Sequence, residues 1–172
     1  MATYRHEWDL GAVSPSVSAR IAMSILQSRP NAMFPFTVRG TRGETSIILA
    51  SSYDLINTVG PLGNWGTGPD PVQVSAIGPL FFTFTTLAGH HRGAGQTISF
   101  ECFERAGRVW LAQYGTYVST WSHPLTTVFN MGANMGASGA WALQAHNLRD
   151  ALGTAGSVED AIIPGGRTVW PG

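Results

Sequence analysis

The sequence predicts an α+β fold in which a curved antiparallel sheet of about seven strands wraps around a long C-terminal helix and leaves an internal apolar cavity. Three observations predict this fold. Short β-rich runs separated by glycine and proline follow residue 34, one amphipathic helical segment precedes them, and a longer helical segment follows them. Because an antiparallel sheet with one apolar face needs a cover, the late helix is expected to lie against it.

The first 30 residues predict a strand and then a helix. Residues 4–9 alternate between aromatic and charged side chains, which is the period-two pattern of a half-buried strand. Ser14 and Pro15 then supply a helix N-cap and a proline at the first helical position. The helix should end near Gln27, because Pro30 biases the residue before it away from helical geometry.

Six more strands are predicted in the middle of the chain, separated by turn signals such as Ala106-Gly107. Successive antiparallel hairpins are the economical arrangement for them. The stretch Asn57–Pro71 holds four glycines and three prolines and is predicted to be a loop. The predicted strands are Phe36–Arg39, Thr45–Ser51, Val72–Ile77, Leu80–Leu87, Thr97–Arg105 and Arg108–Thr120.

Asn130–Leu152 is predicted to be the long helix, and Gly153 is predicted to end it. Three glycines in its first half each cost about 1 kcal/mol relative to alanine, and either close backbone packing or room for a ligand explains them. Residues 1–153 are expected to form a single domain, with residues 154–172 as a tail packed on its surface. The apolar face of the helix carries Trp141, Ala145, Leu148 and Leu152.

The composition excludes several classes of protein. Charged residues make up 12% of the 172 residues, the formal net charge is zero, and the ten basic residues are arginines spread singly along the chain, which argues against nucleic-acid binding. The lone Cys102 excludes an intramolecular disulfide and a cysteine zinc site. No apolar run approaches the roughly 20 residues of a membrane span. Because the N-terminus carries charges where a signal peptide is apolar, a cytoplasmic protein is expected.

Several segments resemble a known superfamily: residues 14–26 after the first strand, Phe34-Pro35-Phe36 after the helix, Val72–Phe103, and above all Leu80–Val109. They are similar to a less-studied bacterial branch of the START-like helix-grip superfamily. That superfamily groups plant ligand binders, lipid-transfer domains and polyketide aromatase/cyclases. The resemblance implies a hydrophobic small-molecule ligand, natural-product biosynthesis and no cofactor, and it leaves both enzymes and carriers open.

His90, His91 and Arg92 lie between glycines at the tip of a predicted hairpin. Three interpretations are open: a solvated turn, an acid/base or ligand-binding group, and a metal site with distant ligands, since adjacent side chains on an extended chain point apart. For catalysis, His90 is the candidate acid or base, and Arg92 or Tyr117 would hold a carbonyl oxygen. No metal is assigned.

Both rows of side chains along Arg108–Thr120 are largely apolar, which predicts cover on both sides, by the late helix on one and by loops, the tail or a second subunit on the other. With the odd-numbered row inward, Gln113 and Tyr117 are polar groups in an apolar wall that need a hydrogen bond or a ligand. The abundant aromatic surface suits a flat, conjugated guest. The candidate ligand-binding residues are Gln113, Trp110, Phe82, Phe84, Phe100, Trp141 and Met135.

Three functions are compatible with these features of the sequence. The first is a cyclase-type enzyme that folds a polyketide-like or conjugated natural-product intermediate by shape restriction and directs ring closure with acid/base groups. The second is a carrier that binds a lipid or pigment without changing it. The third is an interaction module in which Arg108–Thr120 forms a homodimer surface.

Overall fold

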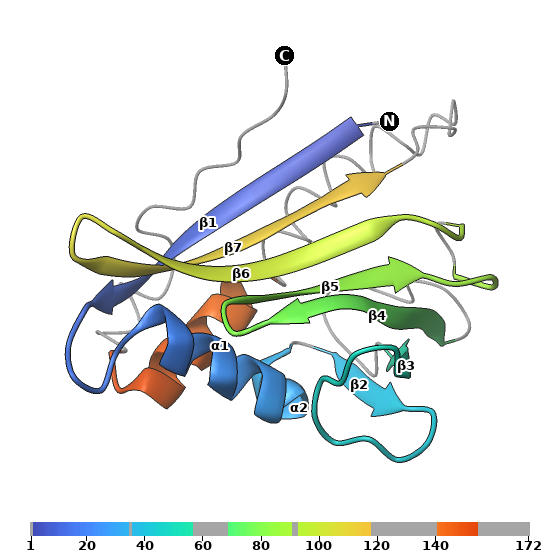
Figure 1. Cartoon of the computed structure of the whole chain (residues 1–172), viewed down its shortest axis with the longest axis horizontal. Helices are drawn as coiled ribbons and strands as arrows, with labels where there is room; N and C mark the ends of the chain where they lie inside the picture. The colour runs from blue at the N-terminus through green and yellow to red at the C-terminus, as the bar shows by residue number, and fades with distance from the viewer. Residues whose placement is uncertain (1, 35, 57–68, 91–92, 118–140, 155–172) are drawn as a thin grey trace.

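The computed structural model describes residues 2–34, 36–56, 69–90, 93–117 and 141–154. Its elements are β1 (Ala2–Ala12), α1 (Ala19–Ser28), α2 (Pro30–Met33), β2 (Thr37–Gly40), β3 (Ser52–Ile56), β4 (Asp70–Gly78), β5 (Phe81–Thr86), β6 (Thr97–Arg105), β7 (Arg108–Tyr117) and a terminal helix over residues 141–152. The strands form one antiparallel sheet in the order β1-β7-β6-β5-β4-β3-β2 (Figure 1). The predicted class, an α+β fold of a seven-stranded antiparallel sheet with a terminal helix, is therefore confirmed.

Pairing of the first strand with the last makes the sheet continuous from β1 to β2. The hairpin between β6 and β7 turns at Ala106 and Gly107, which both have positive φ angles, as a tight two-residue turn requires. Side chains alternate along each strand, so Phe82 and Phe84 of β5 are buried on the inner face while Phe81 is 37% exposed on the outer face. Within the described ranges, no helix is long and apolar enough to cross a membrane.

The terminal helix ends where the sequence predicts. Gly153 adopts a φ of 71°, its N–H donates to the carbonyl of Asp150, and the N–H of Thr154 donates to the carbonyl of Arg149. These two bonds form a Schellman motif, which satisfies carbonyls at a helix C-terminus. Of the predicted span, residues 130–140 lie outside the described residues, as does the tail from residue 155 onward.

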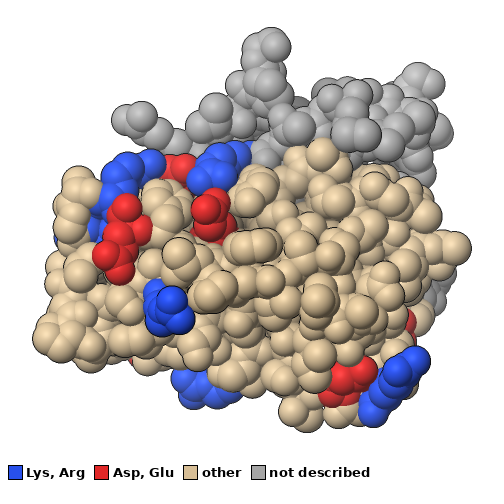
Figure 2. Space-filling model, in the orientation of Figure 1, with Lys and Arg blue, Asp and Glu red and all other residues tan. Residues whose placement is uncertain are grey.

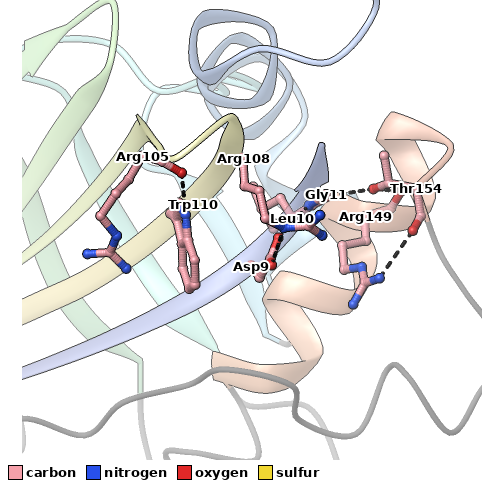
Figure 3. A network of polar contacts seen from close by, with 8 residues as sticks. All are labelled: Asp9, Leu10, Gly11, Arg105, Arg108, Trp110, Arg149 and Thr154. Carbon is pink, nitrogen blue, oxygen red and sulfur yellow. Dashed lines mark hydrogen bonds and ion pairs between the residues drawn. The ribbon is translucent and has the colours of Figure 1, made fainter. Parts of the chain in front are cut away.

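The C-terminal end of the terminal helix contacts β1 at the bulge between Asp9 and Gly11 (Figure 3). The Thr154 hydroxyl donates to the carbonyl of Leu10 at 2.5 Å. Gly11 has a φ of 122°, and a Cβ built on it would lie 2.9 Å from the Thr154 Cβ. The absence of a side chain at Gly11 therefore allows the helix end to approach the sheet this closely.

Gly11→Ala is expected to lower the free energy of unfolding by about 1–2 kcal/mol more than Gly107→Ala does. Both positions have positive φ, but a Cβ added at Gly107 would meet no atom within 4 Å, whereas at Gly11 it would meet Thr154. The φ of 122° at Gly11 also lies further from the left-handed region that alanine can adopt, so both effects make Gly11→Ala the costlier variant. Urea denaturation of the wild type and the two variants measures this difference. Equal losses in the two variants would contradict the close docking of the helix end.

The predicted start of the first helix is wrong, whereas its predicted end near Gln27 is confirmed within one residue, since α1 ends at Ser28. The helix begins at Ala19 and not after Ser14, because Ser14 and Val17 form an isolated bridge and Ser18 is the N-cap, its hydroxyl accepting the Ile21 N–H at 3.2 Å. Pro30 also does more than end α1, since it occupies the first position of α2.

The predicted strand Thr45–Ser51 is not a strand. The strand in this region, β3, begins at Ser52, which pairs with Gln73 of β4. Ala50 has a φ of 63°, which an extended strand does not allow. The buried Tyr53 forms hydrogen bonds with backbone groups of this segment. Its hydroxyl donates to the carbonyl of Ser46 at 2.7 Å and accepts the N–H of Ile48 at 3.0 Å. These bonds and burial give Tyr53 a structural role, and burial raises the pKa of its hydroxyl.

Arginine side chains cover the outer apolar row of β7. The guanidinium carbon of Arg5 lies 5.0 Å from the Tyr114 ring centroid, and that of Arg105 lies 4.4 Å from the Trp110 centroid. Burial would raise the pKa of Glu7 between these arginines, but hydrogen bonds and ion pairs with Arg105 and Arg5 lower it overall. Charged residues on the outer face gather mainly here, and most of the rest of that face is uncharged (Figure 2).

Candidate ligand site beneath the terminal helix

A row of buried side chains crosses the inner face of four strands. His6 of β1 pairs with Gln113 of β7, Gln113 pairs with Phe100 of β6, and Phe100 pairs with Phe82 of β5. Each of the four is at most 6% exposed. The row changes from polar at β1 and β7 to aromatic at β6 and β5, so one part of the inner wall offers hydrogen bonds and the next offers rings.

Phe100 lies at the centre of the aromatic part. Its ring centroid is 4.9 Å from that of Phe82 in a stacked pair, 5.0 Å from Phe34 and 5.7 Å from Trp141. These contacts join the sheet to the chain after α2 and to the terminal helix. Of the candidate ligand-binding residues, the structure brings together Phe82, Phe84, Phe100, Trp141 and Gln113.

The polar part is a chain of hydrogen bonds that runs from β1 to the terminal helix. The Trp8 indole Nε1 donates to Gln113 Oε1 at 2.6 Å, and Gln113 Nε2 donates to Gln144 Oε1 at 2.7 Å. Gln113 Nε2 also lies 3.4 Å from the carbonyl of Trp141. Gln113 and Gln144 are fully buried, so the predicted polar group in the apolar wall has its partners inside the protein.

This series of hydrogen bonds ends at a donor that has no acceptor among the described residues. Gln144 Nε2 is buried and has no hydrogen-bond partner among the described residues. A buried donor left without a partner costs about 1–3 kcal/mol, so such atoms are rare unless something else binds them. The sequence-based prediction did not include Gln144. A glutamine three residues after Trp141, on the apolar face of a predicted helix, could have indicated a buried polar group there.

His6 adds a neutral imidazole to this wall. It is 6% exposed, and its ring stacks on Trp8 with centroids 6.4 Å apart and an interplanar angle of 17°. Burial lowers the pKa of His6 below 6.5, because the charged form loses its hydration. The imidazole is therefore uncharged at neutral pH.

The lowered pKa of His6 predicts acid sensitivity. Above about pH 6.5 the side chain is neutral in both the folded and unfolded states, so the folded protein keeps its full stability. As the pH falls below this value, the unfolded chain binds a proton more readily than the folded protein, and stability is lost. Chemical denaturation between about pH 7.5 and about pH 5 is expected to show a smaller loss for His6→Gln than for wild type.

Gln73→Ala is the control for this experiment, because the Gln73 side chain does not titrate and its amide is exposed, where it donates to the carbonyl of Ala50. We expect that variant to lose about as much unfolding free energy on acidification as the wild type does. An unchanged acid-side loss in His6→Gln would contradict the burial of a neutral imidazole at this position.

The candidate catalytic residues do not form one described cluster. The His90 side chain is 8% exposed, so it is not a solvated turn residue, and its Nδ1 lies 4.0 Å from Asp70 Oδ1 at the start of β4. Arg92 and Met135 lie outside the described residues, and of Tyr117 only the backbone, paired with Ala2, is described. Trp110 does not join the inner wall, because it lies on the outer face beneath Arg105.

The described residues hold no group of three or more His, Cys, Asp and Glu side chains suited to a metal ion. Cys102 is buried on the inner face, and burial, with the nearby Glu101 carboxylate, raises the pKa of its thiol. The inner wall therefore offers neutral hydrogen-bonding groups and aromatic rings.

Solved structures of other proteins have a fold similar to that of this chain. The Aha1 dimer from Colwellia psychrerythraea aligns with a TM-score of 0.56 at 13% identity, covering 88% of this chain and 96% of that one. CalU16 from Micromonospora echinospora aligns with a TM-score of 0.50 at 12% identity, covering 91% of this chain and 76% of that one. The fold is the helix-grip fold.

A third example, Ara h 8.0201, aligns with a TM-score of 0.54 at 9% identity and covers 89% of this helix-grip chain and 99% of its own. No protein-family model matches the sequence, and no curated protein matches it. At these identities the likeness establishes the fold, and the chemistry of the site has to be argued from this chain's own residues.

Proposed function

We propose that the protein binds a neutral, hydrophobic small molecule between the inner face of the sheet and the terminal helix. The observation that carries this proposal is the unsatisfied amide nitrogen of Gln144, buried at the end of a hydrogen-bonded chain and close to the aromatic cluster around Phe100. A few placed polar groups in a mostly aromatic wall are typical of sites for small hydrophobic ligands.

The absence of buried charge supports a neutral ligand. The buried residues of the described ranges include no Asp, Glu, Lys or Arg, and burial keeps His6 uncharged at neutral pH. An ionised ligand would lose its hydration here without a compensating charge, which is costly in an apolar environment. Flat conjugated molecules suit the site better, because rings such as Phe100 and Trp141 can stack on them.

The direct test is equilibrium dialysis of the protein against fluorene, a flat tricyclic hydrocarbon, and against 9-fluorenone, its ketone. Saturable binding of both at one molecule per chain is expected. Leu143→Ala is the control, because Leu143 is 46% exposed next to Gln144 on the same helix and should not affect binding. Failure of both compounds to bind in a saturable way would overturn the proposal.

We also propose a second function, in which the bound molecule is cyclised with His90 as the general acid or base; the contact between His90 and Asp70 supports it. The His90 imidazole is largely buried and lies 4.0 Å from the Asp70 carboxylate, an arrangement that suits a general acid or base. Ring closure of a linear 1,3,5-triketone illustrates the chemistry. The enol oxygen of one terminal ketone forms a C–O bond to the other terminal carbonyl carbon, and water then leaves. His90 would accept the enol proton and pass it to the attacked carbonyl oxygen, which becomes a hydroxyl. It would then accept a proton from the adjacent CH2 group and donate it to that hydroxyl as it leaves as water, so that the imidazole ends neutral, with Arg92 or Tyr117 holding a carbonyl oxygen.

A suitable probe is 1,5-diphenylpentane-1,3,5-trione, whose cyclisation to the pyranone is followed by chromatography. The cyclase proposal predicts that wild-type protein accelerates this conversion and that His90→Ala loses most of the acceleration, by about 10²-fold or more for a general acid or base. His146→Ala is the matched histidine control. Binding of the triketone without acceleration would establish the carrier function instead.

A further inference from the structure

We infer that the bound molecule presents a hydrogen-bond acceptor, such as a ketone or quinone oxygen, to Gln144 Nε2. This inference rests on the proposed function and goes further, because it names the chemical class of the ligand. It follows from the direction in which the hydrogen bonds between Trp8, Gln113 and Gln144 run.

The indole of Trp8 sets that direction. An indole N–H can only donate, so the atom of Gln113 that lies 2.6 Å from Trp8 Nε1 must be the amide oxygen. Gln113 Nε2 is then the atom that faces the terminal helix. Its 3.4 Å contact with the carbonyl of Trp141 favours the same orientation, because a carbonyl oxygen accepts.

Gln113 in turn fixes Gln144. Since Gln113 Nε2 donates, the Gln144 atom at 2.7 Å must be the oxygen, and a reversed Gln144 amide would place two donors against each other. The atom that Gln144 has left to offer is therefore Nε2, a donor, and it is the buried atom that has no partner among the described residues. A hydroxyl oxygen or carbonyl oxygen satisfies it, whereas a ligand N–H facing it does not.

Three tricyclic compounds of matched shape separate the possibilities: 9-fluorenone offers an acceptor, carbazole offers an N–H donor, and fluorene offers neither. Dissociation constants are measured by equilibrium dialysis for wild type and Gln144→Leu. Comparing the two proteins for each compound cancels differences in the hydration of the compounds. Gln144→Leu is expected to raise the dissociation constant of 9-fluorenone by about threefold to tenfold. The dissociation constant of fluorene should not change, and that of carbazole should stay the same or fall.

Two further variants make the test robust. Gln144→Met preserves the length of the side chain and serves if Gln144→Leu fails to give a native circular dichroism spectrum. Trp8→Phe removes the donor that orients Gln113, so it should reduce the preference for 9-fluorenone over carbazole while fluorene binding is kept. A purely structural role of Trp8 would change the three affinities equally.

The outcomes distinguish this inference from the proposed function. Equal weakening of all three compounds by Gln144→Leu would show that Gln144 only packs against the ligand, and it would overturn the inference while leaving ligand binding intact. Stronger weakening of carbazole than of 9-fluorenone would show that the site accepts a donor, which also overturns the inference. Absence of saturable binding to wild type for every compound would overturn both.

Discussion

Phe100→Ala is expected to lower the free energy of unfolding by about 3–5 kcal/mol, the range for truncating a buried phenylalanine. Phe100 is 1% exposed, and its ring contacts rings from three separate parts of the chain. Truncation removes the apolar contact area and also the packing that joins the terminal helix to the sheet through Trp141. Urea denaturation followed by tryptophan fluorescence measures the loss.

Phe81→Ala is the matched control, because Phe81 lies in the same sheet, across from Glu101 on the outer face, and is 37% exposed. Its cost should be about 1 kcal/mol or less, since an exposed ring loses little on truncation. A Phe100→Ala cost as small as that of Phe81→Ala would show that the aromatic cluster does not hold the helix and sheet together.

Gln113→Leu is expected to cost about 2–5 kcal/mol, although leucine is apolar and of similar size. The substitution leaves two buried groups without their partner, the indole N–H of Trp8 and the amide oxygen of Gln144. Each orphaned group costs about 1–3 kcal/mol, which outweighs the gain from burying more apolar surface. Thermal and urea denaturation both report this loss.

A double-mutant cycle with Trp8→Phe identifies the cause. In Trp8→Phe the indole donor is gone, so removing Gln113 in that background orphans one group fewer. The double variant is therefore expected to be more stable than the sum of the single losses predicts, by about 1 kcal/mol or more. Additive losses would contradict the hydrogen bond between Trp8 and Gln113.

The sheet could be predicted from the sequence because its hairpins are local. In the run from Leu80 to the turn at Ala106-Gly107, apolar alternation and glycine turns coincide, and the predicted strands match β5 and β6 closely. Thr45–Ser51 has the same β-branched composition, yet the hydroxyl of Tyr53 binds its backbone groups. That contact competes with strand pairing, and composition alone does not reveal it.

The polar part of the site was harder to predict because it depends on contacts between distant residues. Trp8 and Gln113 are 105 residues apart and meet because β1 pairs with β7, and Gln144 reaches them from a third segment. Periodicity shows that Gln113 occupies an apolar row, but it does not show which residues face it. The partner of a buried polar group is a property of the tertiary fold.

The most direct measurement of the central claim is a two-dimensional ¹⁵N–¹H NMR spectrum of the side-chain amide groups during titration with 9-fluorenone. The Gln144 NH₂ signals are assigned by their absence in Gln144→Leu. We predict that these signals shift in a saturable way and more than those of Gln73, whose side-chain amide donates to the carbonyl of Ala50 in an exposed position. Saturable binding that leaves the Gln144 signals unchanged would contradict a ligand held between the terminal helix and the sheet.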